Sequence, residues 1–400
     1  MRDQDVIIAG AGASGLTSAL ALAEGGRRVA VVGHIERSAP GRTVALFDGS
    51  LRFMRALGLG GWLDASGAPL EVMRIIDDTD SLFRQPQVDF RAAEIGLPAF
   101  GLNVENTALV AELADRVRAH PAITLHEDLI ESFTTEPESV RVRLASGGEL
   151  EAPLLVAADG RASPTRTRAG IRTRVHPWPQ TALTLVLAHT RPHRNVSTEF
   201  HTRAGPCTLV PLPGRAGSPH RSSLVWMMKP RDAERRRALP DEALAREIER
   251  QTHHILGSLR IEGPRGAYPM STMRVGSVTA PRLALVGDAA HGFPPIGAQG
   301  LNLGLRDIAD LTAALEGAAD PGAASVLADY AAQRRGDIAW RTLGVDQLNG
   351  VLLESLPMAD MARGAGLLAL STIGPLRRFV MRLGIEPRRR VVAGARPRSA

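Results

Sequence analysis

The chain has 400 residues, which is more than one hydrophobic core usually serves, so two domains are expected. Its formal net charge of +6 makes the surface basic. The basic residues are scattered and do not alternate with aromatic residues, which argues against nucleic acid as a partner. An anionic cofactor or an acidic membrane surface explains the positive charge equally well.

Cysteine and histidine usage argues against a metal site. Cys207 is the only cysteine, which excludes an internal disulfide and a cysteine-rich metal site. The histidines between residues 176 and 254 are scattered rather than placed at ligand spacing, so we predict no metal. The N-terminus enters a strand at Asp5 without the pattern of a signal peptide, and no apolar run is long enough to span a membrane. We therefore expect a cytoplasmic protein.

The N-terminal segment predicts a dinucleotide site. An apolar strand at residues 5–9 leads into Gly-Ala-Gly-Ala-Ser-Gly and then an alanine-rich helix. In this G-x-G-x-x-G pattern Gly10 makes the tight turn, Gly12 lets a pyrophosphate approach the backbone, and Gly15 lets the helix pack close to the strand. A nicotinamide is the alternative ligand, and the segment at residues 282–310 weakens that alternative.

The second strand, at residues 28–32, lacks the acid expected at its end. That acid binds the adenosine ribose in such units, and Gly33 occupies its position. Glu36 stands three residues too late. The ribose contact is therefore left open, whereas the pyrophosphate site is not affected.

The spacing of apolar residues divides the middle of the chain into predicted helices and strands. Residues 44–57 predict an apolar helix, residues 69–100 predict strands of a second sheet, and residues 124–158 predict a meander. Strand-like segments then dominate until about residue 277, with one helix near residues 241–256. They predict a mostly antiparallel sheet, whose returning strand carries Tyr268 and Met270; core packing is one explanation for these two residues.

Residues 282–310 predict strand, loop and helix. The helix has one core face, which consists of Leu301, Leu305, Ile308, Leu311 and Leu315, while Arg306, Asp307 and Asp310 are predicted to be solvated. In the loop, Gly297 and Gly300 leave the N–H groups of residues 300–302 open to a ligand at a helix N-terminus, where negative charge is favoured. Asp288 can accept hydrogen bonds from a polyol. A ligand that carries a polyol at one end and partial negative charge at the other is a flavin.

This segment carries a family resemblance. Gly-Asp-Ala-Ala-His at 287–291, Pro-Pro-Ile-Gly-Ala-Gln-Gly-Leu-Asn at 294–302 and Leu-Gly-Leu-Arg-Asp at 303–307 resemble the flavin-binding segment of aromatic-ring flavoprotein monooxygenases, in particular the ubiquinone-biosynthesis hydroxylase branch. The resemblance implies an α/β fold with a Rossmann-like FAD-binding domain of discontinuous segments, an inserted β-rich substrate domain and C-terminal helices. It implies FAD, with NADPH or NADH as electron donor, and hydroxylation of an aromatic ring by molecular oxygen through a flavin C4a-hydroperoxide.

The resemblance also implies roles for the residues of this segment. In the family, the Asp of the motif that begins at Gly287 holds the ribityl chain, which implies this role for Asp288. Pro295 would lie beside the reactive edge of the flavin, and no protein side chain is assigned as catalytic. The N–H groups that follow the Pro-Pro loop meet the pyrimidine edge, which implies Gly300, Leu301 and Asn302.

Three other positions match family contacts. Arg42 would pack against the dinucleotide. Asn106 would contact FAD, and an N-cap role explains this residue equally well. Asp159-Gly160, followed by Arg166, resembles the motif near the flavin pyrophosphate and the nicotinamide cleft; Arg166 is either a phosphate partner or a surface residue at a helix start.

The implied FAD-binding domain comprises residues 1–70, 101–175 and 278–345, and the substrate domain comprises residues 71–100 and 176–277. Residues 346–400 are expected to form C-terminal helices and a basic tail. Between residues 356 and 385, arginines interrupt apolar residues as in an interfacial helix, and a packed terminal hairpin is the open alternative.

The predicted substrate is a small, prenylated phenol of ubiquinone biosynthesis. Its tail requires access to a bilayer, so we expect peripheral contact at the inner face of a membrane, together with a multi-protein complex. Two alternatives remain open. One is hydroxylation of another aromatic or polyketide-like metabolite, and the other is a non-catalytic, FAD-holding component of an assembly.

Overall fold

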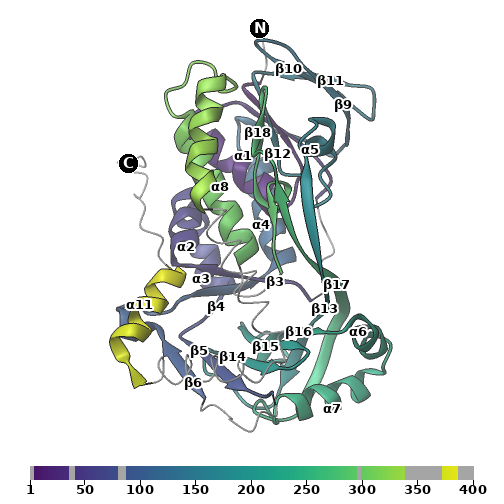
Figure 1. Ribbon diagram of the computed structural model, residues 1–400, viewed down its shortest axis with the longest axis vertical. Coiled ribbons are helices and arrows are strands. Elements are labelled where there is room, and N and C mark those ends of the chain that lie inside the picture. Colours follow the sequence, from purple (N-terminus) through teal and green to yellow (C-terminus); the bar gives the residue numbers. More distant parts are fainter. Residues whose placement is uncertain (1–3, 36–40, 80–86, 295–298, 338–371, 386–400) are drawn as a thin grey trace.

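Two sheets organise the protein. The computed structural model describes residues 4–35, 41–79, 87–294, 299–337 and 372–385. In Figure 1 the upper half holds one sheet with α1, α4 and α8, and the lower half holds a second sheet with α6 and α7. The long strands β13 (Thr173–His189) and β17 (Leu259–Val275) extend between the halves. This mixed architecture confirms the predicted α/β fold class.

The upper sheet has six strands in the order β18-β19-β12-β1-β2-β8, and all neighbours except β18 and β19 pair in parallel. Every residue of β1, β2 and β12 is buried because both faces of the sheet are covered, which explains their unbroken apolar sequences. The strands are β1 (Val6–Ala9), β2 (Val29–Val32), β8 (Ile123–His126), β12 (Leu154–Ala157), β18 (Thr279–Ala280) and β19 (Leu283–Leu285).

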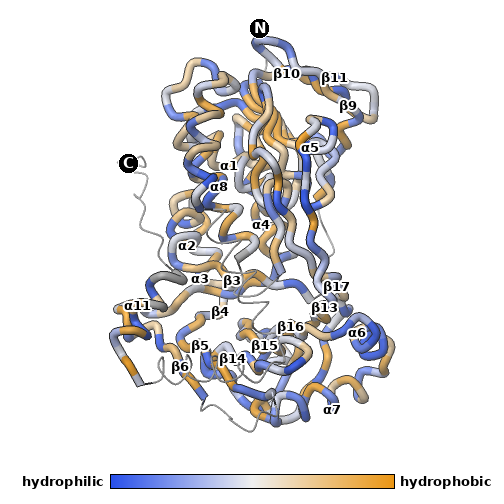
Figure 2. Tube along the Cα trace, viewed as in Figure 1, coloured by the Kyte–Doolittle hydropathy of each residue, from blue (hydrophilic) through white to orange (hydrophobic). Residues whose placement is uncertain are grey.

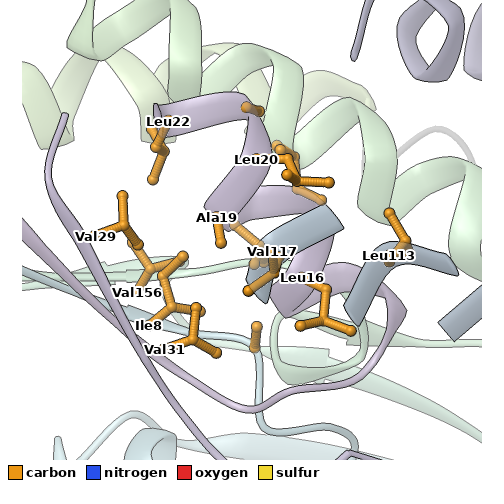
Figure 3. Close-up of a cluster of buried hydrophobic side chains, with 14 of the residues drawn as sticks. Ile8, Leu16, Ala19, Leu20, Leu22, Val29, Val31, Leu113, Val117 and Val156 are labelled. Carbon is orange, nitrogen blue, oxygen red and sulfur yellow. The ribbon is translucent and has the colours of Figure 1, made fainter. Parts of the chain in front are cut away.

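Helices cover one face of this sheet: α1 (Ala13–Glu24), α4 (Asn106–Ala119) and α8 (Gln299–Leu315). Figure 3 shows Leu16 and Ala19 of α1 among the strand residues Ile8, Val31 and Val156. The predicted core face of α8 is confirmed, since Leu301 packs partly buried against this core and the other four positions are buried: Leu305, Ile308, Leu311 and Leu315.

A three-stranded sheet covers the other face. It consists of β9 (Ile130–Thr135), β10 (Val140–Leu144) and β11 (Glu149–Ala152), and β10 buries Val140, Val142 and Leu144. The predicted meander over residues 124–158 is therefore right only for these three strands. The flanking β8 and β12 belong to the parallel sheet instead.

The predicted helix over residues 44–57 is wrong in its first part. Residues 43–47 form β3 (Thr43–Phe47), which pairs with β7 (Gly101–Glu105) beside β4 (Ala68–Pro69). A side chain at Gly101 would overlap the Leu46 carbonyl, so the pairing depends on this glycine. Helical structure follows as α2 (Asp48–Met54), the short helical turn η1 (Arg55–Leu59) and α3 (Gly60–Ser66).

The lower sheet, named here the substrate sheet, has eight strands in the order β20-β17-β13-β16-β15-β14-β5-β6. Its pairs are antiparallel except β14 with β5, as predicted for a mostly antiparallel sheet. Besides β13 and β17, its strands are β5 (Val72–Asp77), β6 (Val88–Arg91), β14 (Val196–Thr202), β15 (Gly205–Leu212), β16 (Arg221–Met228) and β20 (His291–Gly292).

The two faces of the substrate sheet differ. One face packs Leu185, Phe200 and Trp226 against α6 (Pro230–Arg237) and α7 (Asp241–Gln251). In Figure 2, α6 is mainly hydrophilic, whereas α7 mixes hydrophilic and hydrophobic residues. The sequence predicted only the second of these helices. The other face carries a smaller cluster around Met227 and Met270. The remaining elements are η2 (Ala92–Ile95), α5 (Pro164–Arg168), η3 (Gly287–Ala289) and α11 (Gly374–Ile385).

The glycines after β1 have different structural roles. Gly10 has a φ of +109°, which favours glycine, and a side chain at Gly15 would overlap the Gly10 carbonyl. Gly15 therefore lets α1 start directly against the turn, as predicted. A Cβ atom at Gly12 would meet nothing within 4 Å, so this position faces open space.

These roles predict opposite results for two equivalent substitutions in the apoprotein. Gly15→Ala should lower the free energy of unfolding by about 1 to 3 kcal/mol, because the added methyl group overpacks the turn. Gly12→Ala should change it by only about 0.5 kcal/mol or less. Urea unfolding of both variants, followed by circular dichroism, measures the difference. Equal stability of the two variants would show that the turn is not packed in this way.

Candidate functional site

The carboxyl ends of β1 and β2 present a glycine-lined approach. Gly12 begins α1 with open space beside it, which is what close contact with a pyrophosphate requires. A Cβ atom at Gly33 would stand 2.6 Å from the Ala11 nitrogen, so the end of β2 packs directly on the turn. This contact leaves no space for the ribose-binding acid at that position, and Glu36 lies outside the described residues.

The N-terminus of α8 faces the same region of the parallel sheet. The helix begins at Gln299, so Gly300, Leu301 and Asn302 lie in its first turn, where backbone N–H groups have no partner within the helix. A Cβ atom at Gly300 would meet nothing within 4 Å. These are the conditions under which a helix end accepts an anionic group, and they agree with the predicted flavin contact. Pro295 and Gly297 lie outside the described residues.

The side chain of Asn302 has a role that the sequence did not reveal. It is 1% exposed, its Oδ1 accepts a hydrogen bond from Phe47 N (3.0 Å), and its Nδ2 donates to the Ala45 carbonyl (2.7 Å). Asn302 therefore fixes β3 against the start of α8. A polar residue in the first turn of a largely apolar helix was the only signal for this contact.

The turn after β19 presents Asp288. Gly287 has a φ of +60°, and a Cβ atom there would stand 2.5 Å from Ser14 Oγ, so the turn packs closely on α1. The carboxylate of Asp288 is half-buried and has no hydrogen-bond partner among the described residues. It is therefore available to accept hydrogen bonds from ligand hydroxyls, as predicted for the ribityl chain.

Asp307, which was predicted to be solvated, is fully buried. Its Oδ2 accepts from Gly287 N (2.8 Å) and pairs with His291 Nε2 (2.7 Å), and its Oδ1 accepts from Arg334 Nε (2.7 Å). The helix at residues 324–337 covers this side of α8, which the spacing of residues within α8 could not show. Asp307 thus holds the backbone of the turn that presents Asp288.

The neighbouring charges are also paired rather than free. Arg334 donates to Asp310 (2.8 Å) and Asp337 (3.0 Å), and Arg306 lies 3.7 Å from Asp337. Burial alone would lower the pKa of Arg334, but Asp307 and Asp337 outweigh it and raise that pKa above its usual value. The predicted solvated stripe of α8 is therefore an ion-pair network.

Asp159 caps a helix. Its carboxylate accepts a hydrogen bond from the Ser163 hydroxyl and another from Thr165 N (3.0 Å), at the start of α5. Gly160, with a φ of +84°, makes the turn between them. A contact of Asp159 and Gly160 with the flavin pyrophosphate stays a prediction.

Arg166 is not a surface residue. It is 5% exposed and donates to the carbonyls of Ala289 (2.9 Å) and Arg161 (2.9 Å). Burial lowers its pKa, and the carboxylate of Asp159 opposes that change. The guanidinium therefore joins the segment after β12 to the turn of Asp288. A direct phosphate contact stays a prediction, and these two hydrogen bonds argue against it.

Arg42 and Asn106 lie next to each other where the two sheets meet. Asn106 N donates to the Arg42 carbonyl (3.1 Å), and the exposed Arg42 guanidinium lies 5.6 Å from the centre of the Tyr268 ring. Asn106 is the first residue of α4 and Glu105 occupies the N-cap position, so the N-cap alternative is wrong. The flavin contacts of both residues stay predictions.

The face of the substrate sheet near Arg42 is apolar. Met270 is 6% exposed and packs with Ala182 and Met227, which supports the core role for this residue. Tyr268 is only partly buried against the same cluster. A separate cavity of about 550 Å³ lies beside α7 and is lined by none of the candidate site residues.

Comparison with known proteins agrees with this geometry. The FAD binding domain family model matches residues 3–345. Ubiquinone hydroxylase UbiL of Rhodospirillum rubrum is 36% identical over 96% of this chain and 92% of its own length. The 3-demethoxyubiquinol 3-hydroxylase of Escherichia coli is 29% identical over 95% of this chain and 98% of its own length.

A solved structure shares the fold. Klebsiella pneumoniae HpxO, complexed with FAD and uric acid, superposes with a TM-score of 0.78 at 19% identity over 96% of each chain. Three features of the site suit FAD: the open glycine turn, the carboxylate of Asp288 and the first turn of α8. The protein therefore belongs to the FAD binding domain family and is an FAD-dependent monooxygenase.

Proposed function

We propose that the protein hydroxylates the aromatic ring of a polyprenyl phenol, a precursor of ubiquinone, with FAD, NADPH or NADH, and molecular oxygen. The proposal rests mainly on the similarity to a ubiquinone hydroxylase, which extends over both sheets and not only over the cofactor motifs. The apolar face around Tyr268 and Met270, where Arg42 lies near the Tyr268 ring, is suited to an aromatic ring.

Bound FAD supplies the redox and oxygen chemistry. The protein binds and orients it. Asp288 accepts hydrogen bonds from the ribityl hydroxyls, and the first turn of α8 stabilises negative charge at the pyrimidine edge. The cluster of Met227 and Met270 excludes water from the face where the ring lies. No nucleophilic side chain is required.

Purified protein should be yellow and should release all of its FAD on acid treatment, since no cysteine or histidine stands in a recognisable flavinylation context. NADPH or NADH oxidation should rise with a prenylated phenol and yield a hydroxylated product by mass spectrometry. Bound FAD without stimulated oxidation would support a non-catalytic component. Product formation only from an unprenylated aromatic metabolite would support the other alternative.

Asp288→Ala should weaken FAD binding about fivefold to 150-fold, because an acceptor for the ribityl hydroxyls is lost at about 1 to 3 kcal/mol. Fluorescence titration of the apoprotein with FAD measures this loss. Asp115→Ala is the control, since Asp115 is an exposed partner of Arg118 on α4. If FAD affinity is unchanged in Asp288→Ala, the residue does not belong to the site.

We further propose that α11 contacts a membrane surface. Among the described residues, five large hydrophobic side chains are exposed, and three of them belong to this helix or its first flank: Ile373, Leu376 and Phe379. Their spacing puts them on one side of the helix, and α11 contains arginines but no acidic residue. Met381 anchors its other side beside Phe100, and Arg377 pairs with Glu94 (2.8 Å). No helix in the described part of the chain is long and apolar enough to cross a bilayer.

The full-length protein should bind anionic liposomes at low salt and leave them at high salt, because each arginine near the surface contributes about 1 kcal/mol that salt weakens. Deletion of residues 356–400, or the double substitution Leu376→Ser and Phe379→Ser, should reduce binding while FAD is retained. Leu129→Ser is the control, as Leu129 is 57% exposed elsewhere. Failure of the unaltered protein to sediment with anionic liposomes would refute this membrane contact.

A further inference from the structure

The chain just after Asp288 joins the substrate sheet. The short strand β20 pairs with β17, with Gly292 opposite Met273 and His291 opposite Arg274. The turn that presents Asp288 and the wall of the apolar face are therefore parts of one hydrogen-bonded surface. A second connection between them runs through a side chain that no family motif assigned.

That side chain is Arg161. Its Nη1 donates to Ser271 Oγ on β17 (3.0 Å), and its Nη2 donates to the Phe293 carbonyl (3.1 Å). Hydrogen bonds from a guanidinium are charge-assisted and stronger than neutral ones. Ser271 directly follows Met270, and Phe293 directly precedes Pro294. One side chain thus connects three segments that lie far apart in the sequence.

The surroundings of Arg161 are shaped to hold it. A Cβ atom at Gly292 would stand 2.9 Å from the guanidinium nitrogens, so the guanidinium occupies the space that a side chain would need. The Arg161 carbonyl accepts a hydrogen bond from Arg166 (2.9 Å), which also binds the Ala289 carbonyl. Two arginines therefore fix the segment 289–293 at both of its ends.

We propose that Arg161 is a positioning residue that sets the distance between the apolar wall at Tyr268 and Met270 and the segment 291–293. The hydrogen bonds of Arg161 described above establish this linkage between β17 and the segment 289–293. Its consequence for oxygen transfer rests on the proposed function, because a ring held by the wall must meet the reactive edge at a fixed distance.

Hydrogen exchange of the FAD-bound protein tests the linkage without any substrate. In Arg161→Gln and in Ser271→Ala, amides of residues 289–293 should exchange about tenfold or more faster, as expected when a hydrogen bond to a charged group is lost. Amides of β1 should keep their rates. Arg161→Lys should lie between, since lysine can reach one acceptor at a time. Arg74→Gln is the control, because Arg74 is a partly buried arginine on β5 of the substrate sheet and binds Asp89 instead.

A second measurement separates positioning from general stability. Among variants that retain FAD, Arg161→Gln should lower the amount of hydroxylated product per NADPH oxidised by about tenfold, with Arg161→Lys partly restoring it and Arg74→Gln leaving it unchanged. If Arg161→Gln does not fold, Ser271→Ala decides, since it removes a single hydroxyl. Unchanged exchange in residues 289–293, or an equal change in Arg74→Gln, would overturn the proposal. Absence of product from the unaltered protein would refute the proposed function, and the exchange rates would still decide the linkage.

Discussion

The buried carboxylate of Asp307 is the interaction on which the rest of the site depends. A fully buried charge is tolerated only when it is paired and hydrogen-bonded, and Asp307 has Arg334, His291 and the Gly287 N–H as partners. These partners come from the helix at residues 324–337 and from both ends of the turn that carries Asp288. Neutralising or displacing Asp307 would leave Arg334 with only Asp310 and Asp337 as partners, and Gly287 N–H would lose its acceptor. The position of the turn is therefore fixed by electrostatics as much as by packing.

Around this fixed turn, polar side chains rather than apolar contacts join the segments. Arg166 binds the carbonyl of Ala289, Asn302 binds the backbone of β3, and Arg161 reaches β17. Each of them satisfies backbone groups that cannot pair within a sheet or helix at a ligand-facing edge. The apolar cores lie away from this edge, between the sheets and the helices or strands that cover them. The site can thus present glycine-lined backbone and the carboxylate of Asp288 to a cofactor without losing its shape.

Local patterns in the sequence correctly predicted the elements that depend mainly on residues close to one another in the chain. Unbroken apolar strands, the glycine turn at Gly10 and the helical face of α8 are of this kind, and all were found. The errors concern partners distant in sequence. Residues 43–47 form a strand because β7 lies beside them, and Asp307 is buried because the helix that carries Arg334, 27 residues later, covers it. Asn302 and Arg161 were missed as side-chain contacts for the same reason, since their acceptors lie more than 100 residues away.

The order of strands in the parallel sheet affects how the protein can be synthesised. β1 pairs with β12, and β12 pairs with β19, so neighbours in the sheet are separated by more than 100 residues of chain. When β12 leaves the ribosome, its free edge stays unpaired until β19 has been made, and such edges favour aggregation. The turn of Asp288 and its support from Arg334 come later still. FAD can therefore be held in this geometry only after the segment that carries Arg334 has been made, and until then the nascent chain lacks the stabilisation that its cofactor would give.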